Sequence, residues 1–271
     1  MTIGEALKEE REKLGLSRYQ FSKGIVDRKF YGKVEKNEGT LSSEKLIQFI
    51  FKYQLNLDNF FNKLKSQAMS DASLLSQMMQ EAFNDKDVGR CHKIKDKILT
   101  LKGEQLLKLR AIVAVAYLEN KLDQLDKGIK KEIFDKLYQK ENFSMDLSAV
   151  RLFSNTMPAL TTEQLHYLIL PFLRNIKSKK YITELNEERI AIIFNNYLAI
   201  CCERQIDDFT VDDVMEYLLK IEDIHLLVYK EIGIFFTSLI RHDYQKAKEI
   251  KHDLTKWNYT KLAKSLEKWC Q

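Results

Sequence analysis

Basic side chains are concentrated in residues 15–39, which hold six Lys or Arg together with four glycines and four aromatic residues. Lysine and arginine can neutralise phosphates and donate hydrogen bonds to O6 and N7 of guanine, and an aromatic ring can contact the methyl group of thymine. The stretch "DRKFYGKVEKN" (27–37) repeats these residue types at helical spacing. The segment therefore has the chemistry needed to contact duplex DNA.

The distribution of charge supports this reading. The formal net charge is +5. Residues 1–65 contain 13 Lys+Arg and 9 Asp+Glu, a net charge of +4, whereas the remaining residues contain 31 and 30, a net charge of +1. A polyanion is thus expected to meet the first quarter of the chain and not the rest.

Individual contacts follow from the helix starts. Asp27 is expected to cap a helix whose first turn carries Arg28, Lys29 and Phe30, the end that enters the major groove in helix-turn-helix proteins. Ser17 is expected to cap the preceding helix, which would cross a phosphate. The alternative is that the basic residues form only a solvated face and that Phe30 packs in the core, as Tyr31 is expected to do. The predicted DNA contacts are Ser17, Arg18, Tyr19, Arg28, Lys29, Phe30, Lys33, Lys36 and Asn37.

Five short amphipathic helices account for residues 3–65, and a tight turn joins the second to the third, which is the helix-turn-helix arrangement. Gly15 is expected to end the first helix, and Ser42 or Ser43 to cap the fourth. The apolar positions assigned to the inner faces of the first, fourth and fifth helices are Ile3, Ala6, Leu7, Leu14, Leu46, Ile47, Ile50, Phe60, Phe61 and Leu64, with Arg11 on the stripe of the first helix.

These elements give the segment a specific resemblance. "GEALKEEREKLGLS", the small Ser22, "FYGKVEKNEGTLSSEKL" and "YQLNLDNFF" resemble the lambda-repressor-type (XRE) DNA-binding domain over residues 3–65. Two positions depart from that pattern: Gly24 comes early, and Gly32 lies inside the reading helix at a cost of roughly 1 kcal/mol relative to alanine. We expect Gly32 to let this helix approach the DNA backbone closely.

Longer helices follow, at a regular spacing. Four apolar helices begin near Glu104, Asp146, Glu187 and His225, at separations of 42, 41 and 38 residues, and each is followed by a second amphipathic helix. Helix pairs with a period near 40 residues predict a stacked solenoid with a concave inner surface. The fold expected is therefore all-α, with a helix-turn-helix domain over 1–65 and a TPR-like helical-repeat domain over 66–271.

This combination resembles the Rgg family, also called MutR or GadR regulators, of Gram-positive bacteria. The resemblance covers nearly the whole chain, although its C-terminal part depends on architecture and spacing more than on a sharp motif. It implies a homodimeric transcription factor that binds an operator in duplex DNA and a short peptide in the concave groove. The alternative, from a different class, is a repressor whose helical repeats serve only for dimerisation and protein docking.

A polar column marks the candidate peptide site. An offset of 41 residues aligns "RLFSN" (151–155) with "IIFNN" (192–196), so that Asn155 matches Asn196. An asparagine amide can donate to and accept from one peptide unit of an extended ligand, and an arginine one turn earlier can pair with a carboxylate. The alternative is that these amides bond to neighbouring helices. The predicted peptide contacts are Arg151, Asn155, Asn195, Asn196 and Ser238, whereas Phe153 and Phe194 are expected in the core.

Other functional classes find little support in the sequence. The chain has no apolar run long enough to span a bilayer, and its start alternates charged and apolar residues too early for a signal peptide, so we expect a cytoplasmic protein without membrane contact. The five histidines are scattered, and no phosphate-binding glycine loop or metal motif is present, so neither an enzyme nor a cofactor is expected. The four cysteines are expected to be reduced, with the penultimate Cys270 exposed.

Overall fold

The computed structural model describes residues 1–68, 70–140, 143–178 and 184–269. Those residues form α-helices and short 3₁₀ turns, with no strand among them, which confirms the predicted all-α class. The chain divides into two compact units, Met1–Met78 and Met79–Gln271, here called the head and the body. The predicted domain boundary after residue 65 falls inside helix α5 (Leu57–Ala68), whereas the division between the units falls inside α6 (Asp71–Asn84).

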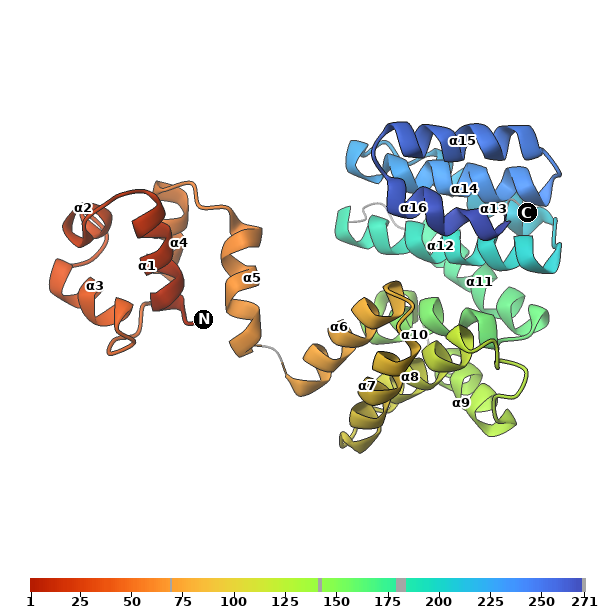
Figure 1. Ribbon diagram of the computed structural model, residues 1–271, viewed down its shortest axis with the longest axis horizontal. Helices are drawn as coiled ribbons and strands as arrows, with labels where there is room; N and C mark the ends of the chain where they lie inside the picture. Colours follow the sequence, from red (N-terminus) through yellow and green to blue (C-terminus); the bar gives the residue numbers. More distant parts are fainter. Residues whose placement is uncertain (69, 141–142, 179–183, 270–271) are drawn as a thin grey trace. The chain divides into compact units, whose positions relative to one another are not determined.

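The head contains α1 (Ile3–Lys13), α2 (Arg18–Ser22), α3 (Arg28–Glu35), α4 (Ser43–Lys52) and α5 (Leu57–Ala68), shown from red to orange in Figure 1. The side chains of Ser17, Asp27 and Ser42 accept hydrogen bonds from backbone N–H groups in the first turns of α2, α3 and α4. These three residues are the N-caps that the sequence predicts. They fix where each short helix begins, because a side-chain acceptor satisfies donors that have no partner within the helix.

Aromatic rings form the centre of the head. Phe21 contacts Tyr31, Phe49 and Tyr53 at ring-centroid distances of 5.5, 5.0 and 4.3 Å. Tyr31 is fully buried, as the sequence predicts, and so is Phe60. Ala6 and Leu7 of α1 belong to the same core, which therefore draws residues from all five helices and holds the inner face of α3 in place.

Four residues that the sequence assigned to inner faces are instead exposed: Ile3, Leu14, Ile47 and Phe61 have 39, 45, 49 and 47% of their surface accessible. Ile3 and Leu14 lie at the two ends of α1, beyond the reach of the core. Ile47 is one residue away from the stripe that Leu46 and Ile50 define, and Phe61 follows the buried Phe60. Adjacent residues on a helix point about 100° apart, so both members of such a pair cannot face one core.

Helices α1 and α3 meet backbone to backbone. A Cβ atom added at Gly4 would lie 1.9 Å from the carbonyl oxygen of Val34, a distance that no side chain can accommodate without movement. At the end of α3, Asn37 has a left-handed backbone (φ 62°), and its amide accepts a hydrogen bond from the Thr2 hydroxyl and donates one to Glu5. The start of α1 therefore fixes the end of α3.

The body is a succession of antiparallel helices. Helices α8, α10, α12 and α14 correspond to the four apolar helices that the sequence predicts, and α9, α11, α13 and α15 to the amphipathic helices that follow them; α9 packs more closely against α10 than against α8. Helix α8 packs against α10, and α12 packs against α14 (Figure 1). The bounds are α7 (Val88–Thr100), α8 (Gln105–Leu118), α9 (Lys127–Tyr138), α10 (Leu147–Thr156), α11 (Thr162–Lys177), α12 (Glu184–Arg204), α13 (Phe209–Leu219), α14 (Leu227–Ile240), α15 (Tyr244–Lys256) and α16 (Thr260–Ser265), with 3₁₀ turns η1 (Phe143–Met145), η2 (Met157–Ala159), η3 (Ile224–Leu226) and η4 (Leu266–Trp269).

Polar contacts between successive repeats keep the predicted period. Their partners are separated by 41 or 42 residues along the chain and belong to adjacent repeats. The contacts are Ser154 with Asn196 (3.0 Å), Thr162 with Arg204 (3.4 Å), His166 with Asp208 (3.0 Å) and Glu188 with Tyr229 (2.9 Å). These helices thus pack with an offset of 41 or 42 residues, close to the offset of 41 residues that aligns the asparagines in the sequence.

Arg204, at the end of α12, closes the connection between α10 and α11. Its guanidinium donates to the backbone carbonyls of Pro158 (3.3 Å) and Leu160 (2.9 Å), as well as to the Thr162 hydroxyl. These carbonyls lie where helical hydrogen bonding is interrupted, and a planar group with five donors can satisfy several acceptors at once. Arg204 is therefore a structural residue of the repeat junction.

We expect Gly4→Ala to destabilise the head by about 1–3 kcal/mol, because the added methyl group must push α1 away from α3. Gly32→Ala is the matched control: its Cβ would meet nothing within 4 Å, and it should stabilise α3 by about 0.5–1 kcal/mol. Both tryptophans, Trp257 and Trp269, belong to the body. Loss of helical circular dichroism without a change in tryptophan fluorescence therefore reports unfolding of the head. Equal effects of the two substitutions would contradict the close approach.

Candidate functional site

The outward face of α3 carries the predicted reading residues. Arg28, Lys29, Lys33 and Lys36 are exposed, and Phe30 has 38% of its surface accessible. None of the four basic side chains forms an ion pair within the described part of the chain. The face is therefore positively charged, uncompensated by neighbouring carboxylates, and open to a ligand.

A buried carboxylate positions this helix. The Glu35 side chain is 1% exposed and accepts hydrogen bonds from Nε of Arg11 on α1 and Nε of Arg18 on α2, each at 2.6 Å. Arg11 also donates to the carbonyl oxygen of Leu16, at 2.9 Å. The single negative charge of Glu35 on α3 thus connects this helix to α1 and α2. We refer to Glu35, Arg11 and Arg18 as the Glu35 clamp.

The clamp decides the protonation of its carboxylate. Burial alone would raise the pKa of Glu35, but the hydrogen bonds from Arg11 and Arg18 outweigh it and hold the pKa below its usual range. The same carboxylate raises the pKa of Arg11. Charge-assisted hydrogen bonds of this kind are stronger than neutral ones, so the clamp is a rigid element under physiological conditions.

The other predicted DNA residues have mixed surroundings. Tyr19 is 57% exposed. Ser17 forms a capping box with Gln20, whose side chain accepts from the Ser17 backbone N–H at 2.9 Å. Arg18 is held by Glu35, and Asn37 by Thr2 and Glu5, so both have intramolecular partners. The structure therefore brings Tyr19 and the five exposed residues of α3 to the surface of one head, while three of the nine also support the fold.

Sequence reasoning did not identify the Glu35 clamp. Among the described residues Glu35 is the one charged residue that is buried, and its role depends on arginines from two other helices. One signal was available, since Arg11 stands on the apolar stripe of the first helix. A charged residue at an inward position usually implies a buried partner of opposite charge.

The candidate peptide residues of the body fall into two groups. Arg151 and Asn155 lie on the exposed side of α10 and have no hydrogen bond or ion pair within the described residues. Asn195 is buried and donates to the carbonyl oxygen of Tyr229 on α14 at 2.9 Å, and Asn196 donates to Oγ of Ser154 on α10 at 3.0 Å. The amide of Asn195 therefore bonds to α14 and that of Asn196 to α10, the helices on either side of α12.

Several side chains of α10, α12 and α14 near the candidate peptide residues are buried. Ser238 on α14 is 9% exposed. The acceptor oxygen Oδ1 of Asn195 is buried without a hydrogen-bond partner in the described structure. Phe153 and Phe194 are fully buried, which confirms their assignment to the core. Asn155 and Asn196 thus occupy aligned positions in the sequence, but Asn155 is exposed whereas Asn196 is hydrogen-bonded to Ser154.

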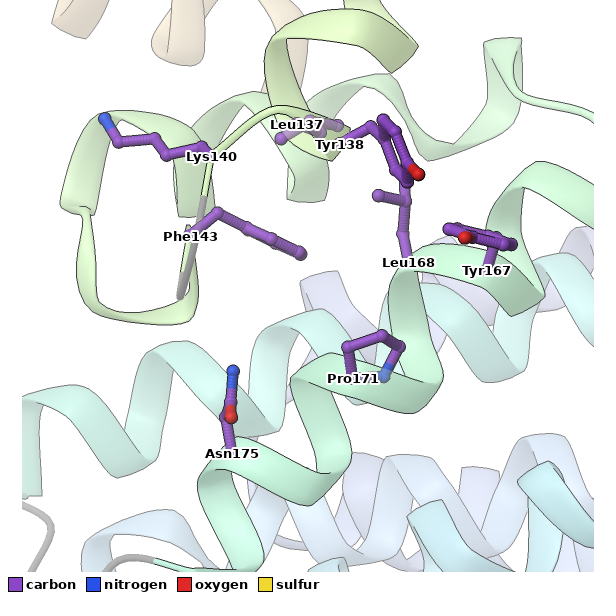
Figure 2. Close-up of a pocket in the computed structure, with 8 residues that line it drawn as sticks. All are labelled: Leu137, Tyr138, Lys140, Phe143, Tyr167, Leu168, Pro171 and Asn175. Carbon is purple, nitrogen blue, oxygen red and sulfur yellow. The ribbon is translucent and has the colours of Figure 1, made fainter.

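A pocket of about 390 Å³ lies between α9, η1 and α11, and Figure 2 shows its lining. The Tyr138 and Tyr167 rings meet at its edge with centroids 5.3 Å apart, and Lys140 is neutralised by Asp146 at 2.6 Å. The walls are mainly aromatic and aliphatic, and none of the five predicted peptide residues is among them. The lining residues are Leu137, Tyr138, Lys140, Phe143, Tyr167, Leu168, Pro171 and Asn175.

Metal ligands and thiols were the remaining candidates for chemistry in the part of the chain that the structure describes. No group of three or more His, Cys, Asp or Glu is placed to hold a metal ion there. Cys91 and Cys201 are buried, and burial raises the pKa of both thiols, that of Cys201 to about 12. Cys270 lies outside the described residues. No helix within them has the length and apolar character needed to cross a bilayer.

Comparisons with known proteins give matches at the level of structure. No family model matches the sequence, and no curated protein does. A solved protein of Listeria monocytogenes EGD-e, provisionally assigned as a transcriptional regulator, superimposes with a TM-score of 0.71 at 17% identity, covering 98% of this chain and 96% of that one. The Streptococcus dysgalactiae SHP pheromone receptor Rgg2 gives 0.65 at 12% identity, covering 99% and 98%.

PrgX in complex with cCF10 is a further match, with a TM-score of 0.64 at 17% identity and coverage of 98% and 90%. Full-length superposition on Rgg2 and PrgX shows that this chain has their fold. The resemblance to the Rgg family that the sequence indicated is therefore confirmed as a likeness of fold over nearly the whole chain.

The Glu35 clamp predicts a pH dependence for the head. In the folded head the pKa of Glu35 is lower than the unfolded value of about 4.3. The stabilisation of the head by Glu35 is therefore fully present above about pH 4.3 and is lost as the pH falls through the folded pKa. Glu35→Gln should destabilise the head by roughly 1.5–3 kcal/mol at pH 7. The difference between wild type and variant should shrink in acid. Melting curves by circular dichroism between neutral and acidic pH measure it, with the exposed Glu44→Gln as control. A difference independent of pH would contradict the clamp.

Proposed function

We propose that this chain is a sequence-specific transcriptional regulator that binds operator DNA through its head and a short peptide through its body. The observation that carries the proposal is the outward face of α3, where Arg28, Lys29, Lys33 and Lys36 have no acidic partner among the described residues. A helix-turn-helix head with such a face fits the major groove. The fold shared with the pheromone receptors Rgg2 and PrgX supports control by a peptide.

In this proposal the first turn of α3 enters the major groove. Arg28, Lys29 and Lys33 donate to guanine edges or phosphates, and Phe30 contacts a thymine methyl group. Ser17, Arg18 and Tyr19 approach a phosphate, and Lys36 and Asn37 lie near the opposite strand. Two heads are needed to read two half-sites, so the chain acts as a homodimer in the cytoplasm, where the DNA is.

The peptide lies across the layer formed by α10, α12 and α14. Arg151 and Asn155 are open to a ligand, whereas Asn195, Asn196 and Ser238 can take part only by exchanging or sharing their present partners. PrgX has been solved with cCF10, and Rgg2 is an SHP pheromone receptor. We extend from them only the chemical class, a short peptide bound through its backbone amides.

A second function has its own supporting observation. Because the amides of Asn195 and Asn196 are bonded to neighbouring helices, the polar column contributes to the packing of the body. A body that serves only for dimerisation and protein docking would need no more than this. The exposed Asn155 and the unpaired Arg151 favour the peptide reading, since packing gives them no role.

For DNA, we expect Arg28→Ala and Lys33→Ala each to weaken operator binding by about 1–3 kcal/mol if the side chain reads a base. Lys220→Ala, which removes the same charge from the body, should have no effect. Fluorescence anisotropy with operator and random duplexes measures the loss. An equal loss on both duplexes would assign Arg28 to a phosphate and not to a base.

For the peptide, we expect Asn155→Ala to reduce affinity without changing the stability of the body, because the side chain is exposed and unpaired. Asn196→Ala should also lower the free energy of unfolding by about 1 kcal/mol, since its hydrogen bond to Ser154 is lost. Binding is measured by calorimetry with hydrophobic peptides encoded in the same genome, and stability by tryptophan fluorescence. Unchanged affinity in both variants would favour the docking scaffold.

A further inference from the structure

Two arginines of the body occupy equivalent positions in adjacent repeats. Arg110 on α8 and Arg151 on α10 are separated by 41 residues, the same offset that relates Asn155 to Asn196. Helices α8 and α10 pack against each other (Figure 1). The repeat register therefore puts the two arginines at matching positions of packed helices, one turn before the column that contains Asn155, and the charge of Arg151 acts on Arg110.

Arg110 is unusual in its surroundings. It lies in the apolar stretch "LRAIVAVAYL" of α8, where its neighbours Leu109, Ala111 and Val113 are buried. Its Nε atom is buried and has no hydrogen-bond partner in the described structure. Neither Arg110 nor Arg151 forms an ion pair with a described residue. Buried guanidinium groups are rare unless an anion accompanies them, because an uncompensated buried charge is strongly destabilising.

The two charges also act on each other. Burial and, to a smaller extent, the positive charge of Arg151 together lower the pKa of Arg110 to about 10. Arg110 nevertheless remains protonated at neutral pH. The free protein thus holds two like charges together, an arrangement that a bound anion would stabilise and that packing alone does not explain.

We propose that Arg110 and Arg151 together bind a carboxylate of the peptide ligand. This inference rests on the proposed peptide function and adds a second cation, the anionic group recognised and the direction of the ligand. A carboxylate matches the planar fork of guanidinium, which can donate two parallel hydrogen bonds. The carboxylate is supplied by the free C-terminus or by an acidic side chain of the peptide.

The repeat register also sets the length of ligand involved. Packed helices lie about 8–10 Å apart, and an extended chain advances about 3.3 Å per residue, so roughly three ligand residues pass from one helix to the next. A ligand that runs from Asn196 on α12 past Asn155 on α10 to Arg110 on α8 therefore spans about six residues. On α8 the column of asparagines is replaced by Ala114, so backbone recognition ends where the arginine pair begins.

Three synthetic libraries of apolar octapeptides test the proposal on the full chain: one with free C-termini, one with C-terminal amides, and one amidated but containing a single aspartate. Peptides retained after gel filtration are quantified by mass spectrometry. We expect wild type to retain carboxylate-bearing peptides about tenfold over amides, a difference of about 1.4 kcal/mol. Retention of the first or the third library identifies the source of the carboxylate.

Arg110→Gln and Arg151→Gln should each bring the ratio close to one, while Arg174→Gln, an exposed arginine of α11, should leave it unchanged. Arg110→Lys keeps the charge without the fork and should retain part of the preference. Equal retention of acids and amides by wild type, or an undiminished preference in Arg110→Gln, would overturn the arginine pair but leave peptide binding intact. Failure to retain any library would overturn the proposed peptide function as well.

Stability without peptide provides a second readout. If an external carboxylate is the partner of Arg110, then Arg110→Gln should keep or raise the melting temperature of the body, followed by tryptophan fluorescence. If the partner is an anion within the protein, the same substitution should lower it by several degrees. A lower melting temperature would therefore count against a ligand site even if retention of peptides also fell.

Discussion

The offset at which the helices of successive repeats pack is the constraint on which the body depends. Ser154 meets Asn196, and Glu188 meets Tyr229, because their helices pack with offsets of 42 and 41 residues, although the helices begin at unequal intervals along the chain. The constraint has a chemical consequence, since every residue type that recurs at this interval becomes a column across the helices. Asn155 with Asn196, and Arg110 with Arg151, are columns of this kind. The offset at which the helices pack thus determines which surface residues are aligned across the body.

The head combines its aromatic core with individual contacts that fix the ends of its short helices. Glu35 holds α1 and α2 to the reading helix by charge, and Gly4 permits contact between backbones. Arg18 belongs both to this anchor and to the residues proposed to approach DNA. The geometry of the reading face and the stability of the head are therefore properties of the same few side chains.

Local signals made much of this structure predictable. Ser17, Asp27 and Ser42 mark helix starts because an N-cap acts within three residues of its own position. What could not be read from the sequence depends on contacts between distant segments. The Glu35 clamp needs three helices, the directions of Asn195 and Asn196 depend on which helices flank α12, and Arg110 is inconspicuous within an apolar run. The offset of 41 residues was visible in the sequence, but not that it would join Arg110 to Arg151.

Packing between the repeats is uneven, and this has a mechanical consequence. Helices α8 with α10, and α12 with α14, share extensive contacts, whereas α10 and α12 share few. Polar contacts supplement the packing at this joint: Asn196 donates to Ser154, and Arg204 donates to the carbonyls of Pro158 and Leu160. A peptide that contacts Asn155 on one side and Asn196 on the other would add a further connection across it. Occupancy of the groove would then tie the two halves of the body together without any change in the fold of either half.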